Sequence, residues 1–383
     1  MKVLIAPLDW GLGHATRCIP IVRYLLEKQC EVVIGADGRP LELLKKEFPA
    51  LEFVVMPGYN ISYLENGSMA LKIAVQIPQI LSGIKREQAL LKKIIKEKKI
   101  DIVISDNRFG LWSREVPCVF ITHQLMVKSP FGEKWIHELN KKYISKYTEC
   151  WVPDSPPPHS PKGGEPVRAL SGDLAHKFAL PVNAKFVGVL SRFASPRPAD
   201  TPLLRERGTK QRLLIILSGP EPQRTIFEKL IIEQLRTNPP VSQGETTPFI
   251  RGILIVQGIT EKNERRKIPD NIEIVSHLTS AELLKEIIVA DIILSRPGYS
   301  TVMDLAVLGK KAIFVPTPGQ TEQEYLAKYF MENKIAYAMR QNKFDLNIAL
   351  KESEKYSGFM EKYSGEEFTG VLDSFIASLR TQA

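Results

Sequence analysis

The sequence predicts an α/β protein made of two Rossmann-like domains that face each other across a cleft. Three observations predict this fold class. Short apolar runs alternate with helical segments, glycine-containing turns follow several of the runs, and the rhythm breaks near the middle of the chain. A length of 383 residues also exceeds one ordinary hydrophobic core, so two domains are expected.

The first half opens with "KVLIAPL", a short apolar run typical of a buried parallel strand. A helix is predicted next, over residues 16–28, because Ile19, Val22 and Leu25 follow helical spacing. The remaining strands expected in this half are also short and apolar: 30–36, 51–57, 100–106, 116–124 and 149–155.

Two stretches interrupt the rhythm. Residues 154–166 are rich in proline and glycine and should form a loop, and residues 191–211 read as an inter-domain linker. A second set of strands follows at 212–219, 251–258, 271–278, 290–298 and 310–319. The expected division is 1–192 for the first domain, 193–211 for the linker, 212–345 for the second domain, and 346–383 for helices that cross back to the first.

Composition limits the classes of function. A net charge of +9 favours anionic partners such as nucleotides or phospholipid headgroups. The four cysteines form no C-x-x-C pair, which argues for reduced thiols and against a zinc site. The N-terminus does not resemble a signal peptide, and no apolar run is long enough to predict a membrane span. A cytoplasmic protein is therefore expected.

Glycine-containing turns follow predicted strands at residues 10–15, 217–224 and 295–304. In an open parallel sheet, ligands bind beyond the carboxyl ends of the strands, where helix N-termini attract anions. The first turn has Thr16 where a dinucleotide fingerprint requires glycine or alanine, which argues against NAD. A phosphate-containing ligand in the cleft is the better interpretation.

The stretch from residue 295 to residue 330 carries the most information. Ser300 and Thr301 are placed to begin a helix whose N–H groups lie near a diphosphate. Asp304 follows one turn later, where its carboxylate can accept both hydroxyls of a ribose. Gln323 and Glu324 begin the next helix and can bind sugar hydroxyls.

These residues resemble the nucleotide-sugar site of GT-B glycosyltransferases. The similarity is greatest to the peptidoglycan N-acetylglucosaminyltransferases that form lipid II, and to related glycolipid synthases. The matching positions are Ser295-Arg296-Pro297-Gly298, Thr301-Val302, Asp304 and Gln323-Glu324-Tyr325. Two of them depart from the family pattern, because Asp304 replaces a glutamate and Glu324 replaces a second glutamine. The second departure bears on the identity of the donor sugar.

Other stretches extend the resemblance. His14 aligns with a family histidine proposed to be catalytic. Residues 188–192 resemble the end of the family's first domain, where an arginine approaches the diphosphate. Residues 122–124 resemble a segment in the family's cleft. The expected donor-binding residues are Gly11, Gly13, Arg192, Ser218, Gly219, Leu278, Arg296, Gly298, Ser300, Thr301, Asp304, Gln323 and Glu324. Asp106, Arg108, His123 and Gln124 are expected on the acceptor side; the alternative is that they only complete local turns and loop backbone.

The resemblance implies transfer of a sugar from a UDP-sugar, with UDP-N-acetylglucosamine as a candidate, to an acceptor hydroxyl. His14 is expected to accept the acceptor proton; the alternative is a structural cap. The cleft turns contain no D-x-D, so a metal-independent, inverting reaction without a cofactor is expected. Gly11, Gly13, His14 and Arg17 also resemble UDP-sugar hydrolases of pseudaminic acid synthesis. A hydrolase or epimerase, or a non-catalytic nucleotide-sugar-binding subunit, therefore remains an alternative.

Residues 68–101 begin as an apolar helical segment and become strongly basic. An amphipathic helix that packs on its own sheet explains this pattern. The functional alternative is contact with a membrane surface, which agrees with a lipid-linked acceptor and a peripheral location on the inner membrane face. Binding to nucleic acid is not expected, because no aromatic-rich basic patch accompanies the segment.

Overall fold

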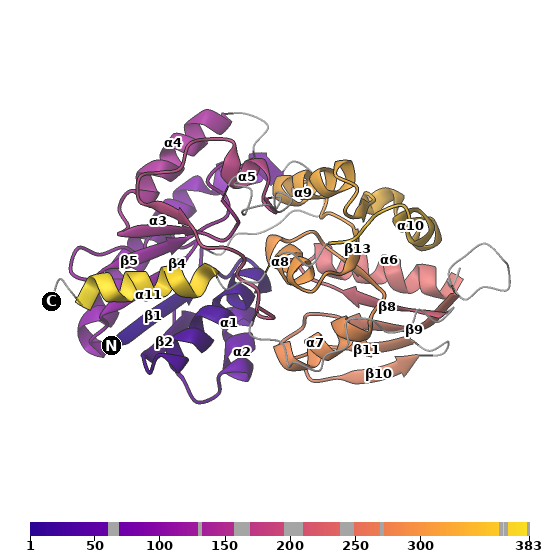
Figure 1. The fold of residues 1–383 in the computed structure, drawn as a ribbon, viewed down its shortest axis with the longest axis horizontal. Helices are drawn as coiled ribbons and strands as arrows, with labels where there is room; N and C mark the ends of the chain where they lie inside the picture. Colours follow the sequence, from indigo (N-terminus) through magenta and orange to yellow (C-terminus); the bar gives the residue numbers. More distant parts are fainter. Residues whose placement is uncertain are drawn as a thin grey trace, which may run out of the picture.

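The computed structural model describes residues 1–59, 69–128, 132–156, 169–194, 210–237, 249–268, 272–359, 363 and 367–380. It contains two seven-stranded sheets, each with helices on both faces (Figure 1). The predicted α/β fold class with two Rossmann-like halves is confirmed. Residues 157–166 of the proline-rich stretch and 195–209 of the predicted linker lie outside the described residues.

The first sheet has the order β3-β2-β1-β4-β5-β6-β7, and its neighbouring strands are all parallel. Its elements are β1 (Lys2–Pro7), α1 (Leu12–Glu27), β2 (Glu31–Ala36), α2 (Gly38–Glu47), β3 (Glu52–Val55), α3 (Met69–Lys98), β4 (Ile102–Asp106), β5 (Cys118–Ile121), α4 (Glu133–Ile144), β6 (Glu149–Val152), α5 (Asp173–His176) and β7 (Ala184–Phe186). Val3 to Ala6 in β1 are wholly buried because helices cover both faces of the sheet.

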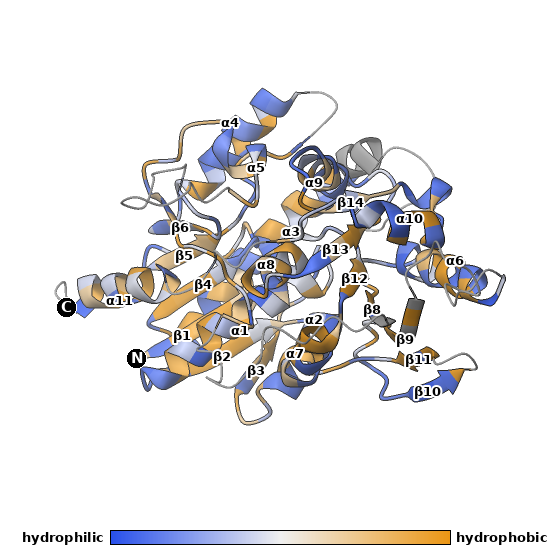
Figure 2. Ribbon diagram, turned by 45° about the vertical axis from the view of Figure 1, so that its right-hand side comes forward, coloured by the Kyte–Doolittle hydropathy of each residue, from blue (hydrophilic) through white to orange (hydrophobic). Residues whose placement is uncertain are grey.

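The second sheet has the order β10-β11-β9-β8-β12-β13-β14, and within it β10 alone runs antiparallel. Its elements are β8 (Lys210–Ile216), α6 (Gln223–Thr237), β9 (Phe249–Val256), β10 (Arg265–Ile268), β11 (Ile272–Val275), α7 (Ser280–Val289), β12 (Ile292–Ser295), α8 (Tyr299–Val307), β13 (Lys311–Phe314), α9 (Thr321–Glu332) and β14 (Tyr337–Ala338). In Figure 2, apolar strands form the interior and amphipathic helices cover them.

The sequence analysis did not predict β7, β10 or β14. Each is a short edge strand of two to four residues, and β10 reads "RRKI", without the apolar composition of a buried strand. An edge strand is paired on one side and partly exposed, so its sequence carries a weaker pattern.

The chain ends with η1 (Gln341–Lys343), α10 (Leu346–Ser353) and α11 (Glu367–Arg380). Figure 1 shows α11, in yellow, lying along the first half of the molecule. There the Tyr24 hydroxyl donates to Asp373 Oδ2 at 2.8 Å, and the Trp151 ring meets the Phe375 ring edge-on at 5.7 Å. The last helix is therefore packed against the domain in which the chain begins.

Candidate functional site

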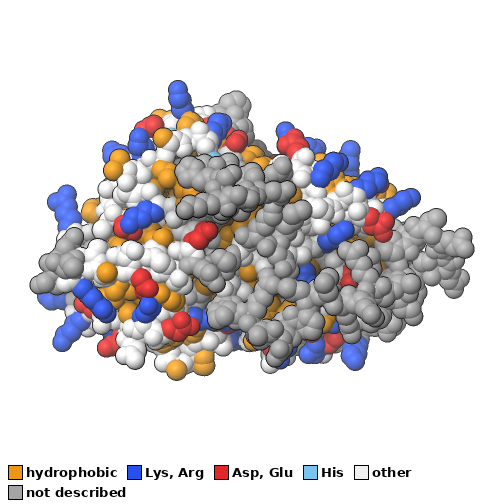
Figure 3. Space-filling model, in the orientation of Figure 1, with side chains coloured by type: hydrophobic (Ala, Val, Ile, Leu, Met, Phe, Trp, Pro, Cys, Tyr) orange, Lys and Arg blue, Asp and Glu red, His pale blue; other side chains and the backbone are white. Residues whose placement is uncertain are grey.

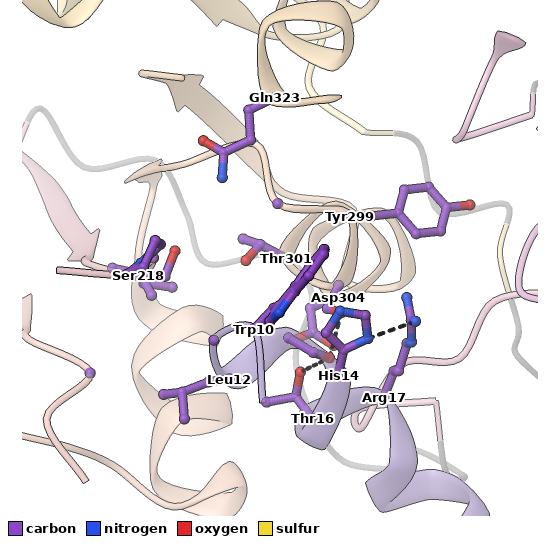
Figure 4. Close-up of a pocket in the computed structure, with 18 of the residues that line it drawn as sticks. Trp10, Leu12, His14, Thr16, Arg17, Ser218, Tyr299, Thr301, Asp304 and Gln323 are labelled. Atoms are coloured by element: carbon purple, nitrogen blue, oxygen red, sulfur yellow. Dashed lines mark hydrogen bonds between the residues drawn. The ribbon is translucent and has the colours of Figure 1, made fainter. Parts of the chain in front are cut away.

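A cavity of about 260 Å³ lies between the carboxyl ends of the two sheets (Figure 4). Its walls come from the turn after β1, the segment after β5, the turn after β8, the start of α7 and the first turns of α8 and α9. Most of the predicted site residues line it: Gly11, Gly13, His14, His123, Gln124, Arg192, Ser218, Gly219, Leu278, Gly298, Ser300, Thr301, Asp304 and Gln323.

The turn after β1 brings the two halves into direct contact. Gly11 precedes α1 with φ of +86°, a left-handed conformation that favours glycine. The Ser300 hydroxyl of α8 donates to the carbonyl of Gly13 at 2.7 Å, and a Cβ on Gly13 would lie 3.2 Å from that hydroxyl oxygen. Gly13 therefore permits close approach of α8, a reason that the sequence analysis did not identify.

His14 lies in the first turn of α1 and lines the cavity with 13% of its side chain exposed. Its Nδ1 is 3.0 Å from Asp106 Oδ1 at the end of β4. Within the described residues, Nε2 makes no hydrogen bond. Nδ1 also lies 2.9 Å from Arg17 Nη2, which can only donate, so this nitrogen faces one acceptor and one donor. In the tautomer with the hydrogen on Nδ1, that nitrogen donates to Asp106, and Nε2 keeps a lone pair that can accept a proton from a ligand.

Asp106 is wholly buried behind His14 and does not line the cavity itself. The Arg17 guanidinium donates hydrogen bonds to both carboxylate oxygens: Nε lies 2.5 Å from Oδ2, and Nη2 donates to Oδ1. Burial alone would raise the pKa of Asp106, but the charges of Arg17 and His14 and their hydrogen bonds outweigh it and lower the pKa to about 2. The carboxylate is therefore ionised at neutral pH.

His123 links this group to the second half. Arg17 Nη1 lies 2.9 Å from His123 Nδ1, and a guanidinium can only donate, so Nδ1 accepts and Nε2 carries the hydrogen. Nε2 then donates to Glu322 Oε1 at 3.1 Å, from the start of α9. The Tyr299 ring stacks on His123 with centroids 4.2 Å apart. Burial lowers the pKa of His123, although the neighbouring Glu322 works in the opposite direction.

Glu322 was missed by the sequence analysis, although it directly precedes Gln323. It lines the cavity and accepts hydrogen bonds from His123 and from the Gln124 side-chain amide. Burial works to raise the pKa of Glu322, but the contact with His123, which includes their hydrogen bond, and the nearby His14 and Arg17 lower it overall. Its partners stand almost 200 residues earlier in the chain, so no local pattern signals the contact.

Asp304 and Arg192 lie together at the cavity wall. Asp304, buried in α8, accepts a hydrogen bond from the Ser191 hydroxyl at 2.7 Å and another from Arg192 Nε at 3.0 Å. Burial raises the pKa of Asp304 overall, while Arg192 opposes that effect. The sequence analysis assigned the two residues to different parts of a donor; the structure pairs them.

The first turn of α8 faces the cavity through Gly298, Ser300 and Thr301, and the turn after β8 faces it through Ser218 and Gly219. The first N–H groups of a helix have no partner within that helix, so this end attracts an anion. Gln323 lines the cavity from α9, where its Oε1 accepts from the backbone N–H of Thr317 at 2.8 Å.

Besides Asp106, three predicted site residues do not line the cavity, and their expected contacts with ligand are corrected here. Arg296 is buried and donates to the carbonyls of Val315 and Pro316 at 2.8 and 3.0 Å, and burial lowers its pKa to about 9. Glu324 is exposed and accepts from the N–H of Gly319. Because of these contacts, both residues stabilise loops instead of reaching the cavity.

The third correction concerns Arg108, which is fully buried in the first half. Its Nε lies 2.7 Å from Glu87 Oε1 of α3, and Nη2 donates to the carbonyls of Met56 and Pro57. Arg108 therefore joins α3 to the loop after β3, which explains why it is unavailable to an acceptor.

Two further observations concern the described ranges alone. They contain no group of three or more His, Cys, Asp or Glu side chains arranged to hold a metal ion. They also contain no helix that is long and apolar enough to cross a membrane.

Each half of the chain is similar to a known glycosyltransferase family domain. Residues 1–147 match the model of glycosyl transferase family 1, and residues 254–361 match the glycosyltransferase family 28 C-terminal domain. An uncharacterised glycosyltransferase of Methanosarcina mazei is 23% identical over 85% of this chain and 82% of its own length. The crystal structure of the kitacinnamycin glycosyltransferase superposes with a TM-score of 0.60 at 14% identity, and the match covers 98% of this chain and 97% of that one.

The fold and the family matches define the chain as a glycosyltransferase of the GT-B class. More particularly, it resembles the enzyme that transfers N-acetylglucosamine to pyrophosphoryl-undecaprenol-linked N-acetylmuramyl-pentapeptide. The Buchnera aphidicola form of that enzyme is 25% identical over 88% of this chain and 85% of its own length. The resemblance stated from the sequence is confirmed.

Proposed function

We propose that the chain transfers a sugar from a UDP-sugar to an acceptor hydroxyl by a metal-independent, inverting displacement. One observation carries this proposal. His14, hydrogen-bonded to Asp106 behind it, and the first turn of α8 line the same cavity from opposite halves. A histidine nitrogen and a helix N-terminus that face the same cavity support a reaction in which both act on one ligand.

In the proposed reaction the acceptor oxygen attacks the anomeric carbon of the donor and forms the new glycosidic bond. The bond from that carbon to the diphosphate breaks, and the electron pair leaves with UDP. The acceptor proton passes to Nε2 of His14, while Asp106 holds Nδ1. The N–H groups at the start of α8 stabilise the charge that develops on the diphosphate.

The donor is proposed to lie along the second half. Asp304 is within reach of ribose hydroxyls only after its carboxylate gives up part of its present pairing with Arg192 and Ser191. Arg192 is then free to approach the diphosphate. Leu278 lines the part of the cavity beside α7, where the uracil ring of the donor is proposed to lie. Gln323 and Glu322 at α9 are the candidates for contact with the donor sugar.

We further propose a lipid-linked acceptor that is reached from a membrane surface. The printed name of the Buchnera relative specifies an undecaprenol-linked acceptor. On α3, Ile77 and Leu81 are 42% and 44% exposed; on α4, Trp135 and Leu139 are 65% and 40% exposed. Figure 3 shows lysine and arginine side chains projecting along the outer edges of both halves, and on these two helices Lys85, Arg86, Lys141 and Lys142 are exposed. Basic residues beside exposed apolar ones favour an anionic lipid surface.

The proposal is tested by incubating the protein with a panel of radiolabelled UDP-sugars, with and without a bacterial lipid extract. Transfer of label to the organic phase only when extract is present supports it. Release of free sugar at the same rate without extract contradicts transfer and favours the hydrolase alternative. Addition of EDTA should leave the rate unchanged, and loss of activity that Mg²⁺ restores contradicts the metal-independent mechanism.

A further inference from the structure

Arg17 is the side chain that connects the proposed base to the rest of the site, and it is 2% exposed. Its Nε and Nη2 bind the two oxygens of Asp106, Nη2 also lies 2.9 Å from His14 Nδ1, and Nη1 reaches His123. Figure 4 shows Arg17 and His14 side by side on α1, joined by a dashed line. One guanidinium therefore contacts three polar side chains of the site.

The contact with Asp106 changes what that carboxylate can do to His14. A histidine beside a bare carboxylate gains a favourable charge interaction when it is protonated, so it retains its proton to higher pH. Here the carboxylate is already neutralised by a fork of two hydrogen bonds, which is the strongest geometry for an arginine–carboxylate pair. His14 thus faces a pair with little net charge.

We infer that Arg17 is a positioning residue for His14. It neutralises Asp106 but leaves Oδ1 within 3.0 Å of Nδ1, so the carboxylate still orients the imidazole. The inference rests on the proposed function, because it concerns the residue that is proposed there to accept the acceptor proton.

Other charged groups also face His14, and their effects must be separated from that of Arg17. Asp9 follows β1, Glu322 begins α9, and His123 follows β5; each interacts electrostatically with His14. On α8, Asp304 lines the same cavity and is paired with Arg192. Asp9 and Glu322 favour a protonated His14, so the positive charge of Arg17 opposes the surrounding carboxylates.

The test is the titration of His14 by NMR in protein carrying ¹³C-labelled histidine, with the resonance assigned from the His14→Gln variant. In Arg17→Gln the midpoint of the His14 titration should rise by about one to three pH units, because the charge of Asp106 is no longer balanced. In Asp106→Asn the midpoint should fall, because the charge of Arg17 then acts alone. Arg17→Lys should restore much of the wild-type midpoint.

Arg212→Gln serves as the matched control. Arg212 pairs with Glu286 at 2.6 Å in the second half, outside the cavity lining, so its loss should leave the His14 midpoint unchanged. An unchanged midpoint in both Arg17→Gln and Asp106→Asn would overturn the inference. If Arg17→Gln does not fold, Asp106→Asn alone provides the test. A His14 midpoint that does not fall in that variant contradicts the inference.

Kinetics provide a second readout that a purely structural role would not move. The acid limb of the kcat/KM profile should shift upward in Arg17→Gln by the same amount as the titration, with turnover recovering at high pH. A uniform loss at every pH contradicts the inference. Because the titration needs no turnover, absence of transfer with any UDP-sugar would refute the proposed function, while the NMR shifts would still decide the role of Arg17.

Discussion

Arg192 and Asp304 form an ion pair across the cleft, with Nε of Arg192 3.0 Å from Oδ2 of Asp304. Arg192 belongs to the end of the first half and Asp304 to α8 of the second. Their side chains are only 12% and 7% exposed. The pair therefore lies where the proposed donor would bind, and a nucleotide would exchange this contact for contacts of its own.

If Asp304 holds the ribose, Asp304→Ala should weaken UDP binding by about 1–3 kcal/mol, because charged hydrogen bonds to the hydroxyls are lost. Isothermal titration calorimetry with UDP measures the change. Glu324→Gln is the control, since Glu324 lies outside the cavity and its loss should not alter affinity. Unchanged UDP affinity in Asp304→Ala would remove Asp304 from the donor site.

If His14 is the base, His14→Ala should lower turnover by about 10²–10⁴-fold. UDP affinity should change little, because the proposed contacts with the nucleotide come from the second half. Turnover, UDP affinity and thermal stability should be measured on one preparation. A loss of turnover that merely follows the unfolded fraction would make His14 a structural residue.

The pair of Asp106 and Arg17 predicts a dependence of stability on pH. The pKa of Asp106 is lowered from 3.8 to about 2, so the folded state binds this proton less readily than the unfolded state. The ionised form therefore stabilises the fold above the unfolded pKa, by about 2 kcal/mol at neutral pH, and that contribution is lost as pH falls from about 4 to about 2.

Chemical denaturation of wild type and Asp106→Asn across this range measures the effect. The variant should be less stable at neutral pH, and its stability should fall less steeply with acid. Parallel curves for the two proteins would show that Asp106 does not contribute to the acid dependence.

Arg296 is expected to act on stability and not on donor binding. Arg296→Met removes donors to the buried carbonyls of Val315 and Pro316, which should cost about 1–3 kcal/mol in unfolding free energy. UDP affinity of the folded fraction should stay within about twofold of wild type. A large loss of UDP affinity without a loss of stability would show that Arg296 contacts the donor, as the sequence analysis predicted.

Periodicity and turn chemistry allowed most of the fold to be predicted. The buried parallel strands read as apolar runs because both of their faces are covered, and the turns after β1, β8 and β12 are recognised by their glycines. The residues that meet in the cavity follow from the same rule, since carboxyl ends of parallel strands share one edge. His14, Ser218 and Thr301 were found in this way.

Sequence pattern did not reveal which way a long polar side chain turns. Arg296 stands in the donor motif but donates to buried carbonyls, and Glu324 turns to Gly319 while its neighbour Glu322 lines the cavity. Along a helix, adjacent residues face different directions, and their partners come from distant segments. The sequence by itself therefore determined the two sheets and the position of the site. Only the tertiary structure decided the Arg17–Asp106, His123–Glu322 and Arg192–Asp304 pairs, because each depends on how distant segments pack.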